Sequence, residues 1–171
     1  MPYLQISKIQ HYLRWTYYKH RDPAGYRQLQ ELREIDRWET RSLKGFDENE
    51  CIFFHIPKTG GISINKALWG KFSGFHRPVN FFQIIFSPYE FWNYFKFTMV
   101  RNPWDRLVSA FFFLKKGGND DADRRWSEAH LKPYNDFNTF VRKWVNEKNI
   151  DYILTFIHSL SLFVLIKKQS L

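Results

Sequence analysis

The stretch that decides the fold reads CIFFHIPKTGGIS, from Cys51 to Ser63. Its first four residues form a short apolar run, which predicts a buried β-strand. A lysine, two hydroxyl side chains and two glycines follow, and apolar residues then recur at helical spacing as far as Trp69. A strand, a glycine-containing loop and a helix in this order present backbone N–H groups and a helix N-terminus to an anion. We therefore predict a phosphate or sulfate cradle here; an ordinary strand-to-helix turn with a surface lysine is the alternative.

A second stretch of the chain has the same arrangement. Residues 96–100 predict another buried strand, and residues 103–112 predict a helix whose first turn begins with a proline. Arg101, between the two, offers a rigid fork that matches a phosphate. Ser109, on the predicted helix, can donate a further hydrogen bond. Two anion sites, each after a buried strand, would suit a nucleotide with two phosphate-like groups.

The two strand-to-helix units predict the fold class. Because each buried strand is followed by a helix, we expect an α/β protein with a parallel sheet and a ligand at the carboxyl ends of the strands. Further helices are expected over about residues 3–18 and 26–41 and from about residue 135, with one or two short helices over 81–95 that are broken at Ser87-Pro88. The other expected segments are a polar turn over 45–50, a surface loop over 119–128, and a buried strand or helix over 150–166.

Composition limits the possible functions. The 171 residues suit one domain, and an aromatic share of 20% argues against disorder. The formal net charge of +9 favours an anionic partner, namely a nucleotide, nucleic acid, an acidic polysaccharide or anionic lipid, without choosing among them. The single cysteine, Cys51, excludes an intramolecular disulfide and is most simply a small core residue, and the histidines lack metal-ligand spacing, so no metal is expected.

The N-terminal residues mix charges with apolar side chains, which is typical of neither a signal peptide nor a membrane span. A cytoplasmic location is therefore the default expectation, and the Golgi lumen or membrane is expected instead if an N-terminal anchor is missing from this sequence. No stable membrane span is predicted elsewhere, because the apolar segment 150–166 is short and is interrupted by His158 and serines.

The two stretches together resemble a known family. Residues 57–63 resemble the 5′-phosphosulfate loop of sulfotransferases, and residues 101–109, followed by aromatic residues, are similar to their 3′-phosphate motif. Those enzymes use 3′-phosphoadenosine 5′-phosphosulfate (PAPS). The resemblance covers residues 51–116 and is strongest to the carbohydrate branch, including heparan sulfate 2-O-sulfotransferase-like enzymes, in which a histidine-containing loop also lies between the motifs.

The resemblance implies a fold and a domain organisation. The fold would be P-loop-like and three-layered, with a central parallel sheet flanked by helices. Residues 1–171 would form a single sulfotransferase-like domain, with an N-terminal helical cover over 1–45 and a nucleotide-binding core over 50–171. Family members usually continue beyond the position of Leu171, so the core is expected to be incomplete at its C-terminus.

The resemblance also implies roles for individual residues. Lys58 would contact the sulfuryl group and the bridging oxygen as a catalytic and cofactor-binding residue, and His76 matches the region of the catalytic base. Arg106 would be structural and pair with an acidic neighbour. The residues that would bind the phosphates of PAPS are Thr59, Gly60, Gly61, Ile62 (where the family often has threonine) and Ser63 at the 5′ side, and Arg101 and Ser109 at the 3′ side. The acceptor would be a sugar or polysaccharide, with no specific nucleic acid and no metal involved.

Two other functions were weighed against this one. A P-loop kinase or NTPase requires a lysine after a longer glycine loop, whereas Lys58 precedes both glycines, so the order disfavours this class. A non-catalytic binder of nucleotide, acidic glycan or RNA stays open, because the net charge allows it. RNA binding would need exposed aromatics interleaved with basic residues, and most aromatics here have core spacing instead. The sequence does not decide the acceptor, the oligomeric state or the activity of this chain.

Overall fold

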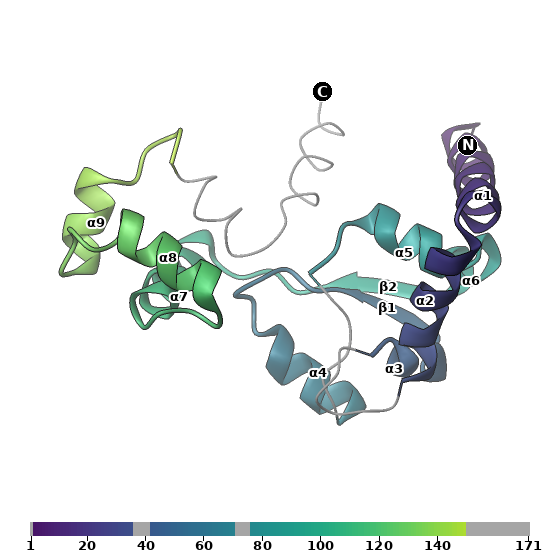
Figure 1. Ribbon diagram of the computed structural model, residues 1–171, viewed down its shortest axis with the longest axis horizontal. Coiled ribbons are helices and arrows are strands. Elements are labelled where there is room, and N and C mark those ends of the chain that lie inside the picture. Colours follow the sequence, from purple (N-terminus) through teal and green to yellow (C-terminus); the bar gives the residue numbers. More distant parts are fainter. Residues whose placement is uncertain (1, 36–41, 71–75, 150–171) are drawn as a thin grey trace. The chain divides into compact units, whose positions relative to one another are not determined.

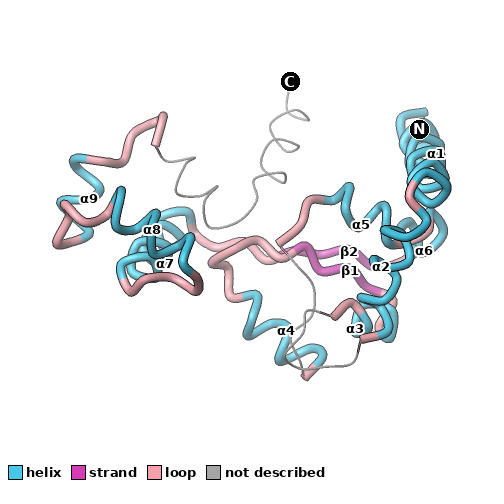
Figure 2. Tube along the Cα trace, viewed as in Figure 1, coloured by secondary structure: helices cyan, strands magenta, loops and turns pink. Residues whose placement is uncertain are grey.

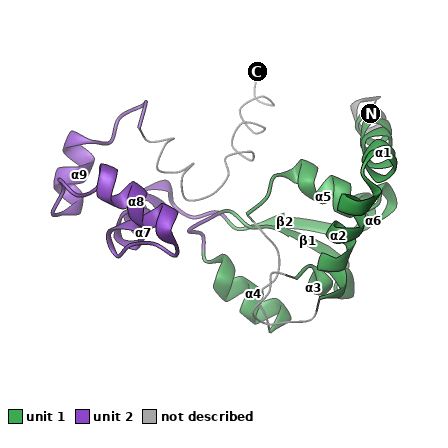
Figure 3. Cartoon of the chain, in the orientation of Figure 1, with its two compact units in different colours: residues 1–56, 60–99 green, residues 57–59, 100–171 purple. Residues whose placement is uncertain are grey.

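The computed structural model describes residues 2–35, 42–70 and 76–149. The chain divides into two compact units, one formed by residues 1–56 and 60–99 and the other by residues 57–59 and 100–171 (Figure 3). Helices and strands follow one another as labelled in Figure 1, and Figure 2 shows how loops connect them. The expectation of a single domain with a cover and a core stays a prediction.

The first unit contains the only sheet among the described residues. Strands β1 (Cys51–Phe54) and β2 (Phe95–Thr98) run parallel, with Cys51 opposite Phe95 and Phe54 opposite Thr98. The helices of this unit are α1 (Pro2–Arg21), α2 (Pro23–Glu34), α3 (Lys44–Glu48), α4 (Gly61–Trp69), α5 (Val79–Ile85) and α6 (Pro88–Asn93). The predicted mixed α/β class with parallel strands is thereby confirmed.

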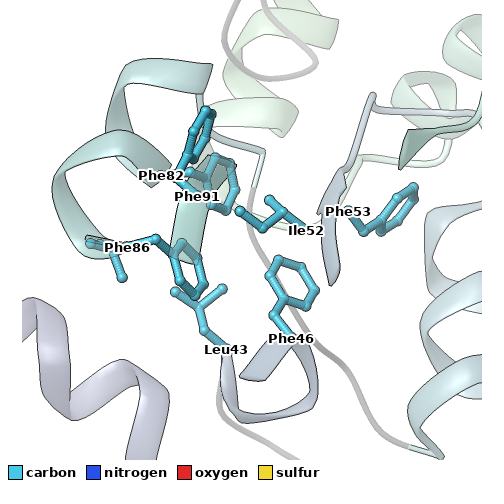
Figure 4. Packing of buried hydrophobic residues seen from close by; sticks show 8 residues of the cluster. Leu43, Phe46, Ile52, Phe53, Phe82, Phe86 and Phe91 are labelled. Atoms are coloured by element: carbon cyan, nitrogen blue, oxygen red, sulfur yellow. The ribbon is translucent and has the colours of Figure 1, made fainter. Parts of the chain in front are cut away.

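Strand β1 forms the centre of the first hydrophobic core. Ile52 and Phe53 are fully buried, as the apolar run predicts, and Cys51 is a buried core residue. Their neighbours in this core are Leu43, Phe46, Phe82, Ile85, Phe86 and Phe91 (Figure 4). Burying a side chain of this size stabilises the fold by about 1.5–3 kcal/mol, so this cluster anchors the strand that leads into the candidate loop.

Strand β2 is less buried than its sequence predicts. Phe95 is 69% exposed and Val100, beyond the strand, is 80% exposed. Each strand has one partner within the described residues, so the difference lies in side-chain cover: the buried residues of the first core include Ile52 and Phe53 of β1 but none from β2. Phe97 is partly buried and stacks on Phe53 with 4.9 Å between ring centroids. The prediction of a fully buried second strand is therefore wrong.

Both predicted N-terminal helices are present, although the second begins earlier than expected. Asp22 accepts a hydrogen bond from the N–H of Gly25 at 2.9 Å, and Pro23 occupies the first turn, so α2 begins at Pro23. On α2, Arg33 donates to both Asp47 on α3, at 2.7 Å, and Glu90 on α6, at 2.6 Å. This ion network ties three helices of the first unit together. The end of the predicted helix, residues 36–41, lies outside the described residues.

The second unit is helical where it is described. Its helices are α7 (Pro103–Lys115), α8 (Asp121–His130) and α9 (Phe137–Lys143), and the first and last were predicted. They share a core of Leu107, Ala110, Phe111, Leu114, Trp126, Leu131 and Phe140. The predicted C-terminal strand or helix over 150–166 lies outside the described residues.

Two predicted loops are helices. Residues 119–128 were predicted to be a surface loop, but most of them form α8, which Asp120 caps by accepting from the N–H of Asp123. Only Asp123 and Trp126 of α8 are buried, and charged residues outnumber its few apolar ones, so the stretch is too polar for its helical spacing to stand out. Residues 45–50 were predicted to be a polar turn, whereas Lys44–Glu48 forms α3 around the buried Phe46.

Candidate anion site

The loop after β1 is a tight turn with two residues in the left-handed region. Lys58 has a φ of 65° and Gly60 a φ of 86°, both in the left-handed region. A positive φ is uncommon for a residue with a side chain, so the turn at Lys58 is constrained. Gly60 is the N-cap of α4 and, having no side chain, cannot accept from the first-turn N–H groups. Those N–H groups, at the positive end of the helix dipole, can therefore serve an anion.

The first residue of α4 packs directly against a histidine. His55 follows β1, is 5% exposed and stacks on Phe53, with ring centroids 5.5 Å apart and planes at 17°. A Cβ atom added to Gly61 would lie 1.8 Å from the Nε2 atom of His55. Because real Cβ atoms do not approach so closely, the second glycine of the motif is required by contact rather than by backbone conformation. The imidazole of His55 thus supports the start of α4.

His76 lies beside the same imidazole. The Nε2 atoms of His55 and His76 are 3.3 Å apart, and the ring centroids are 4.1 Å apart. A hydrogen bond between two imidazole nitrogens needs one protonated and one unprotonated nitrogen. His55 therefore fixes the orientation of His76, and the histidine predicted as a base lies next to the residue that follows β1. No role for His55 is predicted from the sequence alone.

In the second unit, Lys58 lies in a partly buried position between aromatic and charged groups. Its Nζ atom is 3.8 Å from the centroid of the Phe113 ring on α7. Burial lowers the pKa of Lys58, the positive charge of Arg101 lowers it further, and the carboxylate of Asp123 acts in the opposite direction. The charge of the second motif therefore acts on the lysine of the first. Phe113 and Asp123 were missed from the sequence, the latter because α8 was read as a loop.

Arg106 connects the second motif to the first loop inside this unit. Its side chain is buried and its Nε–H donates to the carbonyl oxygen of Pro57 at 2.9 Å. Burial lowers the pKa of this guanidinium. The expected partner was an acidic neighbour, but the hydrogen bond that the structure shows goes to backbone. Arg106 thereby holds the residue immediately before Lys58.

The other predicted ligands differ in exposure. Ile62 and Ser63 are exposed on the first turn of α4, and Ile62 is 54% exposed. Thr59 is partly exposed, Arg101 is exposed just before α7, and Ser109 is partly buried on α7. The roles of these side chains in binding phosphate stay predictions.

Two further findings concern metals and membranes. In the ranges 2–35, 42–70 and 76–149, no group of three or more His, Cys, Asp or Glu side chains is arranged to hold a metal ion. Over the same part of the chain, no helix combines the length and the apolar character needed to cross a membrane. The expectation that no metal takes part stays a prediction.

These features define an α/β protein with a candidate anion-binding loop between a buried strand and a helix. The model of the sulfotransferase family matches residues 43–155, which include both motifs and most of the second unit. The chain therefore belongs to the sulfotransferase family, as the resemblance implied, and family membership supports a transferase. Comparison with curated proteins and with solved structures gave no match. The heparan sulfate 2-O-sulfotransferase-like branch stays a prediction.

Proposed function

We propose that this protein transfers a sulfuryl group from PAPS to a hydroxyl group of a carbohydrate, on a P-loop-like three-layer fold. The observation that carries the proposal is the hydrogen bond from Arg106 to the carbonyl oxygen of Pro57 at 2.9 Å, which joins two motifs far apart in sequence next to Lys58. The positive charge of Arg101 also contributes to the lowered pKa of Lys58. Two cations held near each other repel, and a bound polyanion offsets the unfavourable free energy of that repulsion. An adenosine that carries one phosphate at its 3′ position and a phosphosulfate at its 5′ position has the charges to do so.

Donor binding follows from the side chains on each motif. The N–H groups of Gly60, Gly61 and Ile62 and the hydroxyls of Thr59 and Ser63 are suited to the 5′-phosphate. The guanidinium of Arg101 and the hydroxyl of Ser109 are suited to the 3′-phosphate. The donor set contains cations, N–H groups and hydroxyls, which is the chemistry that a phosphate requires.

PAPS supplies an activated sulfuryl group with a phosphate as its leaving group. The acceptor oxygen forms a bond to sulfur while the bond between sulfur and the bridging oxygen breaks, so negative charge grows on that oxygen. The ammonium of Lys58 is proposed to stabilise this charge. Arg106 contributes indirectly, because it holds the carbonyl of Pro57 and thereby the backbone that precedes Lys58.

We propose that His76 is the base that accepts the proton of the acceptor hydroxyl. An imidazole titrates near neutral pH, so a neutral ring can accept a proton from a sugar hydroxyl. The contact with His55 bears on this role because it orients the His76 ring, with 3.3 Å between the two Nε2 atoms. His55 is a positioning residue in this scheme.

Transfer of labelled sulfate from PAPS to a panel of desulfated glycans tests the proposal. Wild type and Lys132→Ala, an exposed lysine on the second unit, are expected to transfer label, and Lys58→Ala is expected to lose transfer while it keeps its fold. Activity retained in Lys58→Ala would remove that lysine from the leaving-group role. Binding of adenosine 3′,5′-bisphosphate by wild type without transfer to any glycan would instead favour a non-catalytic binding protein.

A further inference from the structure

Helix α1 carries apolar residues on two opposite faces. One face packs into the first unit, where His11 is buried, bonds the carbonyl oxygen of Gln83 at 2.7 Å and contacts the Phe91 ring. The other face carries Ile9, Tyr12, Leu13 and Tyr17, which are between 56% and 68% exposed. At 3.6 residues per turn these four positions fall on one stripe, which we call the α1 stripe. Large apolar side chains gathered on one exposed face indicate an interaction surface.

Cations border the α1 stripe on both sides. By helical geometry, Lys8 and Lys19 lie along one edge, and Arg14 and Arg21 lie along the other. Helix α1 contains no acidic residue over its whole length. Two of these cations lie over aromatic rings, with Lys8 Nζ 5.5 Å from the Trp92 ring and Lys19 Nζ 4.8 Å from the Trp15 ring. The surface is therefore apolar in its centre, rich in tyrosine and positively charged at its margins.

We propose that the α1 stripe docks on the surface of an anionic lipid bilayer. An interfacial helix places apolar side chains at the level of the acyl boundary and its lysines and arginines among acidic headgroups. Tyrosine suits this position because its ring is apolar and its hydroxyl can stay in water. The helix would lie in the plane of the surface, held by its packed face against the rest of the first unit.

Charge disfavours the other occupants of this surface. A second copy of the chain would bring the same four cations against each other. The apolar segment 150–171 of this chain carries one acidic residue, Asp151, against Lys167 and Lys168, so it does not complement the margins. An acidic glycan matches the charge but offers no apolar surface to Ile9 and Leu13. An acidic protein is distinguished from lipid by experiment.

Co-sedimentation of the full chain with vesicles tests this proposal independently of sulfuryl transfer. The protein is expected to bind phosphatidylcholine vesicles that contain phosphatidylserine, and to bind pure phosphatidylcholine vesicles much more weakly. Replacing Arg14 or Lys19 with glutamine is expected to weaken partitioning about fivefold for each cation. Leu13→Ser is expected to weaken it about tenfold or more. Added salt is expected to weaken it further, because it screens the cations.

Matched controls separate the stripe from general surface properties. Tyr89→Ser removes a tyrosine that is 78% exposed on α6, and Arg27→Gln removes an exposed cation on α2. Both variants are expected to partition like wild type. Failure of wild type to bind acidic vesicles overturns the proposal, and so does equal binding by the Leu13→Ser and Tyr89→Ser variants. A dimer that Leu13→Ser dissociates, without vesicle binding, would assign the stripe to a second copy and also overturn it.

Discussion

The contact between Gly61 and His55 gives a quantitative prediction about the candidate loop. In Gly61→Ala, the new Cβ atom would meet the Nε2 atom of His55 at 1.8 Å. The ring cannot move away without losing its stacking on Phe53 or its contact with His76. Forcing an extra methyl group into a packed site costs about 1–3 kcal/mol. We therefore expect Gly61→Ala to destabilise the protein by about this amount, although alanine is otherwise the better helix former.

A double-mutant cycle isolates the contact. When His55 is replaced with alanine, the obstructing ring is absent, and Gly61→Ala is expected to be neutral or slightly stabilising. The coupling free energy between the two substitutions should then be about 1–3 kcal/mol. Equilibrium urea unfolding of the four proteins measures it, provided that the slope of the free energy against urea stays the same.

Gly60→Ala is the matched control for this cycle. Gly60 has a φ of 86° and open space where a Cβ atom would be. The loss of unfolding free energy in Gly60→Ala therefore comes from backbone conformation alone. That cost is about 1–2 kcal/mol, and it should be the same with or without the His55 ring. If Gly60→Ala and Gly61→Ala respond alike to His55→Ala, or if Gly61→Ala leaves stability unchanged, the proposed packing of α4 against His55 is wrong.

Three further predictions address other parts of the protein. Arg106→Met should lower the free energy of unfolding, measured in urea, by about 1.5–3 kcal/mol, because it removes a charged donor from the buried carbonyl of Pro57. A loss below about 0.5 kcal/mol would contradict this, because changes of that size are usual for surface substitutions. Burial raises the pKa of Glu90, but hydrogen bonds from Arg33 and from Ser87 outweigh it and leave that pKa below its ordinary value. The stability from Glu90 is thus present above the ordinary pKa of a glutamate and is lost as the pH falls through the lowered pKa, so wild type and Glu90→Gln should differ in Tm at neutral pH and converge in acid; a constant difference would argue against the ion network. His76→Ala should reduce kcat while the Kd for adenosine 3′,5′-bisphosphate stays the same, and an unchanged kcat would exclude His76 as the base.

Local sequence patterns predicted the elements that hold the candidate site. The apolar run from Cys51 marks β1 because that strand is buried, and glycine and proline mark the starts of α4 and α7. Helix α8 was missed because it is mostly exposed and charged, so its few apolar residues, although at helical spacing, are outnumbered by polar ones. The exposure of β2 was missed because the cover that other elements give to the side chains of a strand is a tertiary property.

Long-range contacts within the site could not be predicted from the sequence. The motif suggests an arginine at position 106, but no local signal shows that it bonds the carbonyl of Pro57. Likewise, the requirement for glycine at position 61 comes from the His55 ring rather than from backbone conformation. Both contacts join residues whose partners are set by packing, whereas spacing rules describe only residues on one element.

The central claim is that Lys58 and Arg101 serve one doubly phosphorylated adenosine. Calorimetric titration with adenosine 3′,5′-bisphosphate in the absence of magnesium tests it most directly, with Arg125→Ala, an exposed arginine on α8, as the matched control for Arg101→Ala. We predict saturable binding by wild type and by Arg125→Ala, and a loss of about 1–3 kcal/mol in Arg101→Ala. Binding of magnesium ATP in preference to the bisphosphate, or a dissociation constant that Arg101→Ala leaves unchanged, would contradict the account.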